Sequence, residues 1–459
     1  MTDRMSDAEA IMWAVEKDSA LRSDFCNLTL LDCRPTDERL EATLTRALRA
    51  IPRLRQRVVS APLRVLPPEF ADDPTHDVEA HIPVLELPAP YDERALLDLC
   101  GRLAEQPLDR ARPLWEFTLI EGLRDGRSAL LQKVHHTITD GVGGLKLSLA
   151  LVDFEREPSG VAEEDEPPAA NGTATPVAVA RNAVVGVAER GIGAVGMMMG
   201  AAGNVFTHPT KVPRRASEAV RLVSSLRRQT LVAEPARSDL FTGRSLRRYF
   251  TTARLPLARM RAAAERLGGS VNDVFVTGLA SALGRYHEAH GSTVDELRLA
   301  MPVSTRVRGD VASANRFAPA RVLVPIQPAH DPTTLFADIH ERLEVAKHES
   351  ALAAVEGLTG LVSGLPTSML VAFTRTQTRT IDFAASNLRG SAVPLYLSGA
   401  QILSSYPFGP RTGTALNVTL LSYVDEALLG FNIDPAAITD PSAFMRDVGD
   451  AFADIIAES

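Results

Sequence analysis

Cysteine is scarce in this chain, and the signatures of several common enzyme classes are missing. Only three cysteines occur in 459 residues, with no C-x-x-C pair, which excludes a disulfide framework and indicates a reducing compartment. Neither G-x-S-x-G nor G-x-x-x-x-G-K-[ST] is present, so the sequence predicts neither a serine-hydrolase elbow nor a P-loop. One G-x-G-x-x-G run, residues 191–196, follows a helix-like segment rather than a strand, which argues against a dinucleotide fold.

Positive charge is also not in excess. Lys and Arg number 49 against 57 Asp and Glu, a net charge of -8, whereas nucleic-acid-binding surfaces are usually basic. No nucleic-acid partner is therefore predicted. The first seven residues are acidic and polar, which predicts no secretory signal and a cytoplasmic protein. No metal site is expected, because the histidines and cysteines nearest to the one histidine pair are remote in sequence.

Length and composition indicate a soluble globular protein with two linked halves. Hydrophobic residues make up 45% and charged residues 23% of the chain, and 459 residues exceed what one ordinary core accommodates. The composition shifts to Glu, Pro, Ala and Gly over residues 155–176, as in linkers. The sequence therefore predicts a first lobe at 1–158, a linker with an apolar helical segment at 159–244, and a second lobe at 245–459.

The apolar segment 177–206 within this linker is rich in Ala, Val, Gly and Met. Its uncharged run, residues 191–207, is about the shortest that spans a bilayer. Because five glycines and Asn204 interrupt that run, the sequence favours a helix at a membrane surface, or one packed on the protein, over a spanning helix.

Both halves combine strands and helices without regular alternation, which predicts a mixed α/β (α+β) fold rather than a doubly wound one. Strands are expected at residues 27–32, 114–121, 128–134, 245–255, 297–303, 321–326, 395–403, 415–424 and 428–433. Helices are expected at residues 36–50, 257–267, 272–290 and 442–457.

The most informative motif is His-His-Thr-Ile-Thr-Asp-Gly at residues 135–141, directly after a predicted strand. A histidine with a pKa near neutrality suits proton removal from an alcohol, amine or thiol. Adjacent residues on a strand point to opposite faces, so at most one of His135 and His136 faces a given pocket. Asp140 either fixes the turn or orients a ring, and Gly141 leaves space for a substrate.

With several other segments, this motif resembles the bacterial wax ester synthase/diacylglycerol acyltransferase family, within the wider group of CoA-dependent acyltransferases and peptide-synthetase condensation domains. The similarity spans nearly the whole chain. It rests on residues 107–116, 135–141, 270–274, 301–306, 386–387 and 417–434. The histidine motif alone specifies only the wider group, whereas its combination with Pro-Leu-Trp at 113–115 and Asn-Asp at 272–273 is more specific.

The resemblance implies two chloramphenicol-acetyltransferase-like lobes with an active-site tunnel between them. It implies an O-acyltransferase that moves a long-chain acyl group from acyl-CoA, a co-substrate, to diacylglycerol or a long-chain alcohol. His136 would be the general base, and no acyl-enzyme and no bound cofactor are needed. The enzyme would be cytoplasmic and attached peripherally to the inner membrane or to lipid droplets.

The resemblance also assigns roles to other residues. His135, Asp140 and Gly141 join His136 in the catalytic motif, and Asp140 would form a structural ion pair with Arg55, or with Arg57 as second choice. Substrate contacts are expected from Trp115, Asn272, Asp273, Ser304, Ser386 and Asn387. Simpler roles stay open: packing for His135 and Trp115, and helix capping for Asn272 and Asp273.

The chain departs from the family pattern in two places. Residues 386–391 read Ser-Asn-Leu-Arg-Gly-Ser where many members have Ser-Asn-Val-Pro-Gly-Pro, and residues 22–25 lack the usual Met-His pair.

Two alternative functions stay open. One is the same fold acting on a carrier-protein thioester or a polyketide alcohol, for which basic pairs at 214–215 and 227–228 are docking candidates. The other is a non-catalytic lipid-binding or lipid-droplet protein, which segment 177–206 would favour. Oligomeric state and acyl chain length are not predicted.

Overall fold

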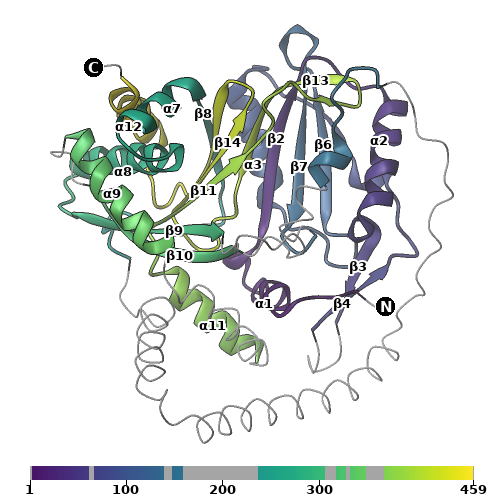
Figure 1. Ribbon diagram of the computed structural model, residues 1–459. Coiled ribbons are helices and arrows are strands. Elements are labelled where there is room, and N and C mark those ends of the chain that lie inside the picture. The colour runs from purple at the N-terminus through teal and green to yellow at the C-terminus, as the bar shows by residue number, and fades with distance from the viewer. Residues whose placement is uncertain are drawn as a thin grey trace, which may run out of the picture.

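The computed structural model describes residues 3–60, 67–138, 147–158, 236–304, 317–326, 331–347 and 366–457. Within these residues the chain folds into two six-stranded sheets and one three-stranded sheet, with helices packed around them (Figure 1). The mixed α/β class expected from the sequence is therefore confirmed. The apolar segment 177–206, the G-x-G-x-x-G run and both basic pairs lie outside the described residues.

The sheet that carries the histidine motif has the order β12-β13-β2-β7-β6-β5. All neighbours in it are antiparallel except β5 and β6. Its strands are β2 (Asp24–Leu31), β5 (Val84–Glu86), β6 (Trp115–Glu121), β7 (Ser128–His135), β12 (Tyr396–Leu397) and β13 (Ala400–Phe408). Since β12 and β13 come from the second half of the chain, the two halves share this sheet.

Helices α2 (Asp37–Ala50) and α3 (Glu93–Glu105) pack with this sheet into one core, to which α1 (Asp7–Val15) adds Ala10 and Trp13. The Thr36 hydroxyl caps α2 by accepting the Arg39 N–H, as expected from the sequence. Helix α2 buries Leu40, Leu44 and Ala47, which recur at helical spacing on one face. β7 is buried over nearly its whole length, including the polar residues Ser128, Lys133 and His135.

The second sheet has the order β10-β9-β11-β14-β15-β8. β11 runs parallel to both of its neighbours, and the other pairs are antiparallel. Its strands are β8 (Tyr249–Pro256), β9 (Glu296–Ser304), β10 (Phe317–Pro325), β11 (Phe383–Arg389), β14 (Leu416–Tyr423) and β15 (Glu426–Ile433).

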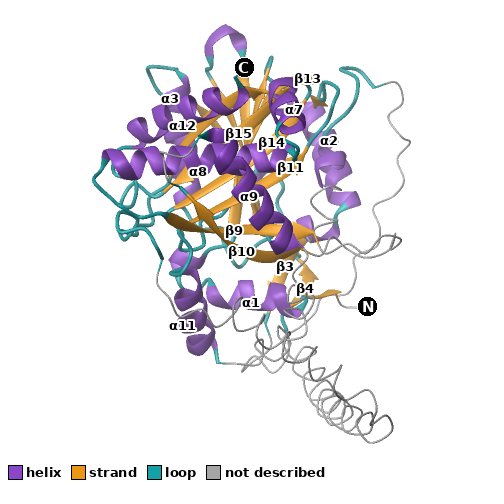
Figure 2. Ribbon diagram, turned by 60° about the vertical axis from the view of Figure 1, so that its left-hand side comes forward, coloured by secondary structure: helices purple, strands orange, loops and turns teal. Residues whose placement is uncertain are grey.

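Four helices gather on the second sheet (Figure 2). They are α7 (Leu257–Arg266), α8 (Val271–Ala289), α9 (Pro332–Lys347) and α12 (Pro441–Ile456). Ser270 and Asp273 form a capping box at the start of α8. A Cβ at Gly278 would lie 2.4 Å from the Phe452 ring, so the glycine lets α8 and α12 approach closely.

A smaller layer lies below the two large sheets (Figure 1). It contains the three-stranded sheet β1-β4-β3 and two helices, α1 and α11, that pack against each other. The bounds are β1 (Asp3–Arg4), β3 (Gln56–Val59), β4 (Glu69–Asp72), α1 (Asp7–Val15) and α11 (Thr367–Thr378). In the part of the chain that the structure describes, no helix is long and apolar enough to cross a bilayer.

The second half differs from the sequence prediction in several places, and helices α9 and α11 were not predicted at all. The strand predicted at 395–403 is the hairpin β12–β13, because Ser398 and Gly399 have positive φ angles of 51° and 83° and reverse the chain. β11 was not predicted, since its sequence, Phe-Ala-Ala-Ser-Asn-Leu-Arg, has no β-branched residue. The strand predicted from residue 245 begins only at Tyr249.

Candidate active site

The histidine pair lies where β7 ends. His135 is the last strand residue and pairs with Asp24 of β2, while His136 begins the turn that follows. The His136 N–H donates to the Ser23 carbonyl at 3.2 Å, and the Ile138 N–H closes the turn on the His135 carbonyl at 2.9 Å. The two rings have different surroundings: His135 packs near Trp13, and His136 lies 4.9 Å from the Phe25 ring centroid.

His135 is buried, and both of its ring nitrogens have partners. Nε2 lies 2.6 Å from Glu16 Oε1, and Nδ1 lies 2.7 Å from Thr137 Oγ1. The Thr137 backbone N–H donates to Nδ1 at 3.1 Å. Because that amide can only donate, Nδ1 is the acceptor, and the proton of a neutral ring lies on Nε2, directed at Glu16. His135 is thus an oriented ring rather than a free base.

His136 has the electrostatics of a neutral base. Burial lowers its pKa to about 4, the neighbouring His135 ring adds to the shift, and Asp24 and Glu16 oppose it. The side chain nevertheless keeps some solvent-accessible surface. At neutral pH the ring is therefore uncharged and able to accept a proton from a group that reaches it.

The predicted ion pair between Asp140 and Arg55 has one member outside the described residues, because residues 139–146 are not described. Arg55 donates to the Leu48 carbonyl at 2.9 Å and lies 3.9 Å from the Asp72 carboxylate. Arg53 instead reaches the histidine turn: its Nη1 donates to the Thr137 carbonyl at 2.6 Å and to Glu9 Oε1 at 2.5 Å. Gly141 is likewise outside the described residues.

A buried ion pair joins β2, the strand beside the histidine strand β7, to the second half of the chain. Asp24, the residue opposite His135, lies 2.9 Å from Arg248 Nη2, and both side chains are almost fully buried. The Arg248 backbone N–H donates to Glu105 Oε1 at 2.8 Å.

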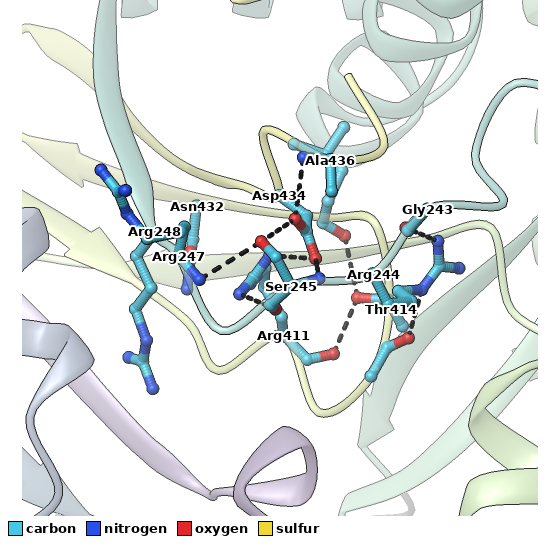
Figure 3. Close-up of polar contacts among 12 residues, drawn as sticks. Gly243, Arg244, Ser245, Arg247, Arg248, Arg411, Thr414, Asn432, Asp434 and Ala436 are labelled. Atoms are coloured by element: carbon cyan, nitrogen blue, oxygen red, sulfur yellow. Dashed lines mark hydrogen bonds and ion pairs between the residues drawn. The ribbon is translucent and has the colours of Figure 1, made fainter. Parts of the chain in front are cut away.

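The segment that leads to Arg248 is held by a second buried carboxylate, on which Ser245 and Arg411 converge (Figure 3). Asp434 accepts the Ser245 N–H at 2.8 Å and its hydroxyl at 2.6 Å. It also pairs with Arg411 Nη1 at 2.6 Å. Burial lowers the Arg411 pKa to about 10, which still leaves the guanidinium charged at neutral pH.

Comparison with known proteins decides the family. Residues 5–275 match the wax ester synthase/diacylglycerol acyltransferase catalytic domain, and residues 313–456 match the WS/DGAT C-terminal domain. A Mycobacterium tuberculosis protein named as a candidate diacylglycerol O-acyltransferase is 32% identical over 467 residues, covering 100% of this chain and 92% of the relative. The chain belongs to the wax ester synthase/diacylglycerol acyltransferase family. The resemblance inferred from the motifs is thereby confirmed, and the protein is an acyltransferase.

Solved structures show the same fold for this acyltransferase. The wax ester synthase/diacylglycerol acyltransferase from Marinobacter aquaeolei VT8 superposes with a TM-score of 0.64 at 22% identity, covering 99% of this chain and 98% of the other. The starter condensation domain of rhizomide synthetase RzmA superposes with a TM-score of 0.59 at 14% identity, covering 99% and 95%. The expected chloramphenicol-acetyltransferase-like fold class is therefore confirmed.

Trp115 of the acyltransferase lies in the core of the first half. It is 1% exposed, its Nε1 donates to the Leu54 carbonyl at 2.7 Å, and it stacks on His81 at 4.5 Å. Its only polar group is therefore already bonded within the protein. The predicted substrate contact stays a prediction, and it would have to be made through the ring.

The structure brings two of the predicted substrate-binding residues together. Asn387 Nδ2 on β11 donates to Asn272 Oδ1 at the start of α8, at 3.4 Å. Ser386 pairs in register with Thr419 of β14. Ser304 ends β9, opposite Phe317, and its side chain is not described.

Asp273 has a capping role that its sequence position already suggested. Its Oδ2 accepts the Ser270 N–H at 2.8 Å and the Ser270 hydroxyl at 2.9 Å, and lies 2.9 Å from His340 Nδ1. Its Oδ1 is buried and has no hydrogen-bond partner among the residues that the structure describes. Its role as a substrate contact is not tested by these bonds and stays a prediction.

Sequence reasoning missed Glu16 and Arg53, two charged residues whose side chains contact the histidine segment. Glu16 lies 119 positions from His135 in the chain, and no motif marks it. Arg53 lies two residues before the expected Arg55, on the 3₁₀ turn Pro52–Arg55. Because such a turn rotates about 120° per residue, the two arginines point in different directions.

Among the described residues, no three potential metal ligands gather around a common point.

Proposed function

We propose that this acyltransferase moves a long-chain acyl group from acyl-CoA to the hydroxyl of diacylglycerol, with long-chain alcohols as further acceptors. The observation that carries the proposal is His136, a neutral ring of low pKa at the end of β7 in a chain of this family. The names of the M. tuberculosis and Marinobacter relatives support the two acceptor classes. One RzmA condensation-domain structure contains C8-CoA, which supports a CoA thioester as the donor.

The proposed mechanism uses one base and no acyl-enzyme. His136 takes the proton of the acceptor hydroxyl while that oxygen attacks the thioester carbonyl carbon. The C–S bond then breaks, an ester forms, and the CoA thiolate receives the proton from His136. A positioned base contributes about 10²–10⁴-fold, so the remaining acceleration comes from holding donor and acceptor in line. The mechanism requires no resident cofactor.

Product analysis with purified protein tests the proposed activity. Labelled palmitoyl-CoA is offered with diolein or with hexadecanol, and a palmitoyl carrier protein replaces the CoA donor in a parallel series. We expect the wild type to form triacylglycerol from palmitoyl-CoA and diolein. The His136→Ala variant should lose this product, whereas the control His290→Ala should keep it, because His290 lies outside the motif. Product from the carrier protein alone would establish the alternative donor. No product from any pair would contradict the proposal and favour a lipid-binding protein.

We further propose that the enzyme attaches to the surface of a membrane or lipid droplet through α11. Met369 is 55% exposed and Phe373 is 39% exposed. Together with exposed Ala372 they lie on one side of the helix at spacings of three and four residues. A groove of about 820 Å³ adjoins this helix, lined by Lys17, Asp18, Ser19, Ala20, Leu246, Thr367, Ser368, Val371 and Arg375. An insoluble acceptor has to be taken from such a lipid surface, which fits exposed apolar side chains on one side of a surface helix.

Cosedimentation with vesicles containing diolein tests the attachment. We expect the double variant Met369→Ser/Phe373→Ser to bind vesicles several-fold less well than the wild type, with an unchanged melting temperature. Val345→Ser is the matched control, because Val345 is 63% exposed on α9. Equal binding by all three proteins would exclude α11 as the attachment site.

A further inference from the structure

The carboxylate of Glu16 is bonded to both sides of the histidine segment. Its Oε1 lies 2.6 Å from His135 Nε2 on β7 and accepts the Ser23 N–H, just before β2, at 2.6 Å. Glu16 itself ends helix α1 as its C-cap residue. We propose that Glu16 is a positioning residue for His136: it fixes the neighbouring ring and the backbone that holds His136. This inference rests on the proposed role of His136 as base.

The first link runs through the side chain of His135. The Thr137 N–H donates to Nδ1, so the remaining ring proton lies on Nε2 and donates to Glu16. The side chains of His135 and Glu16 are 3% and 8% exposed, so water does not readily replace either partner. Since His135 and His136 are consecutive, a ring fixed on one face of the strand sets the direction of the next side chain on the other.

The second link runs through the backbone of Ser23. Its N–H donates to Glu16, and its carbonyl accepts the His136 N–H at 3.2 Å. Two residues further along the chain, the Phe25 ring lies against the His136 ring, with 4.9 Å between centroids. Glu16 therefore determines where Ser23 lies, and Ser23 determines where His136 leaves the strand.

Glu16 also contributes to the electrostatics of the base. Its charge raises the pKa of His136, against the stronger effect of burial. Among the described residues, the cations of Arg22 and Arg110 also interact with the charge of Glu16, and the carboxylate of Asp24 acts on His136. Removing the charge while keeping the hydrogen bonds is therefore expected to lower the pKa of His136 and to change the geometry little.

Two substitutions separate geometry from charge. Glu16→Ala removes both bonds, and we expect kcat to fall on the order of 10- to 100-fold with little change in KM, because misplacement of a reacting group has effects of this size. Glu16→Gln keeps an oxygen acceptor, and we expect it to restore most of kcat while the acid limb of the pH–rate profile moves to lower pH. Glu69→Gln is the control, because Glu69 is a fully buried glutamate that pairs with Arg4 instead.

A readout without substrate completes the test. In ¹⁵N-histidine-labelled protein, the His135 ring should have its proton on Nε2 in the wild type and in Glu16→Gln, and should lose that fixed form in Glu16→Ala. Wild-type kcat in Glu16→Ala would overturn the inference, as would an unchanged His135 spectrum. A Glu16→Gln variant as slow as Glu16→Ala would show that charge, not position, matters. If the wild type itself makes no ester, the proposed function fails, while the spectrum still reports on Glu16.

Discussion

Arg248 forms a buried ion pair with Asp24, the residue of β2 that pairs with His135 on the neighbouring strand β7. Arg248 lies three residues after Ser245, whose N–H is bound by Asp434. The pair connects β2, the strand beside the histidine-bearing β7, to the second half of the chain. Breaking it should therefore disturb both stability and the position of the histidines.

Replacement of one partner of this pair is expected to be costly. Asp24→Asn and Arg248→Met should each lower the free energy of unfolding by about 3–5 kcal/mol, because each leaves a buried charge without its counter-ion. The double variant Asp24→Asn/Arg248→Met should lose less than the sum of the two. Urea unfolding of all four proteins measures the coupling, and strict additivity would show that the pair does not interact.

The low pKa of His136 predicts a characteristic pH dependence. Its folded pKa of about 4 lies below the ordinary value of 6.5. The unfolded chain therefore binds more protons between these values, and stability falls as pH drops from above 6.5 toward 4. Melting temperatures of the wild type and of His136→Gln should be measured from pH 7.5 down to pH 4. We expect the melting temperature to fall less steeply in the variant than in the wild type. Parallel curves would mean that His136 titrates normally. The rate of ester formation should fall only as pH approaches 4.

Arg53 rather than Arg55 should be the arginine that matters for the histidine turn. Arg53→Ala removes the bonds to Glu9 and to the Thr137 carbonyl, and we expect kcat to fall about tenfold or more. Among the described residues, Arg55→Ala loses a bond to Leu48 and a long contact with Asp72, and it should retain most activity. Steady-state measurement of kcat in the two variants decides between the two arginines. A larger loss in Arg55→Ala than in Arg53→Ala would favour Arg55, the arginine expected from the sequence.

Trp115 should act through packing. Trp115→Phe leaves the Leu54 carbonyl without its donor and reduces the contact with His81, so we expect a loss of about 1–3 kcal/mol in unfolding free energy. KM for donor and acceptor should change less than twofold. A large rise in either KM at unchanged stability would instead establish the substrate contact that the motif suggested.

The histidine motif could be picked out from the sequence, whereas the residues that contact it could not. His135 and His136 stand out because an adjacent pair after a strand is rare, and the Ser270 cap and Thr36 cap follow from local hydrogen bonding. Glu16 and Arg53 could not be identified, because their contacts depend on how α1 and the Pro52–Arg55 turn pack against β7. The place of β13 in the first sheet was equally hidden, since its own residues specify a strand but not the strand beside which it lies.

The direct test of the central claim is the initial rate of acyl transfer from palmitoyl-CoA to diolein by wild type and His136→Ala, with folding checked by melting temperature. We predict a loss of at least about 100-fold in kcat at little changed KM and with a melting temperature within a few degrees, as expected for removal of a positioned base. Turnover retained within a few-fold by the folded variant would contradict the assignment of His136 as the base.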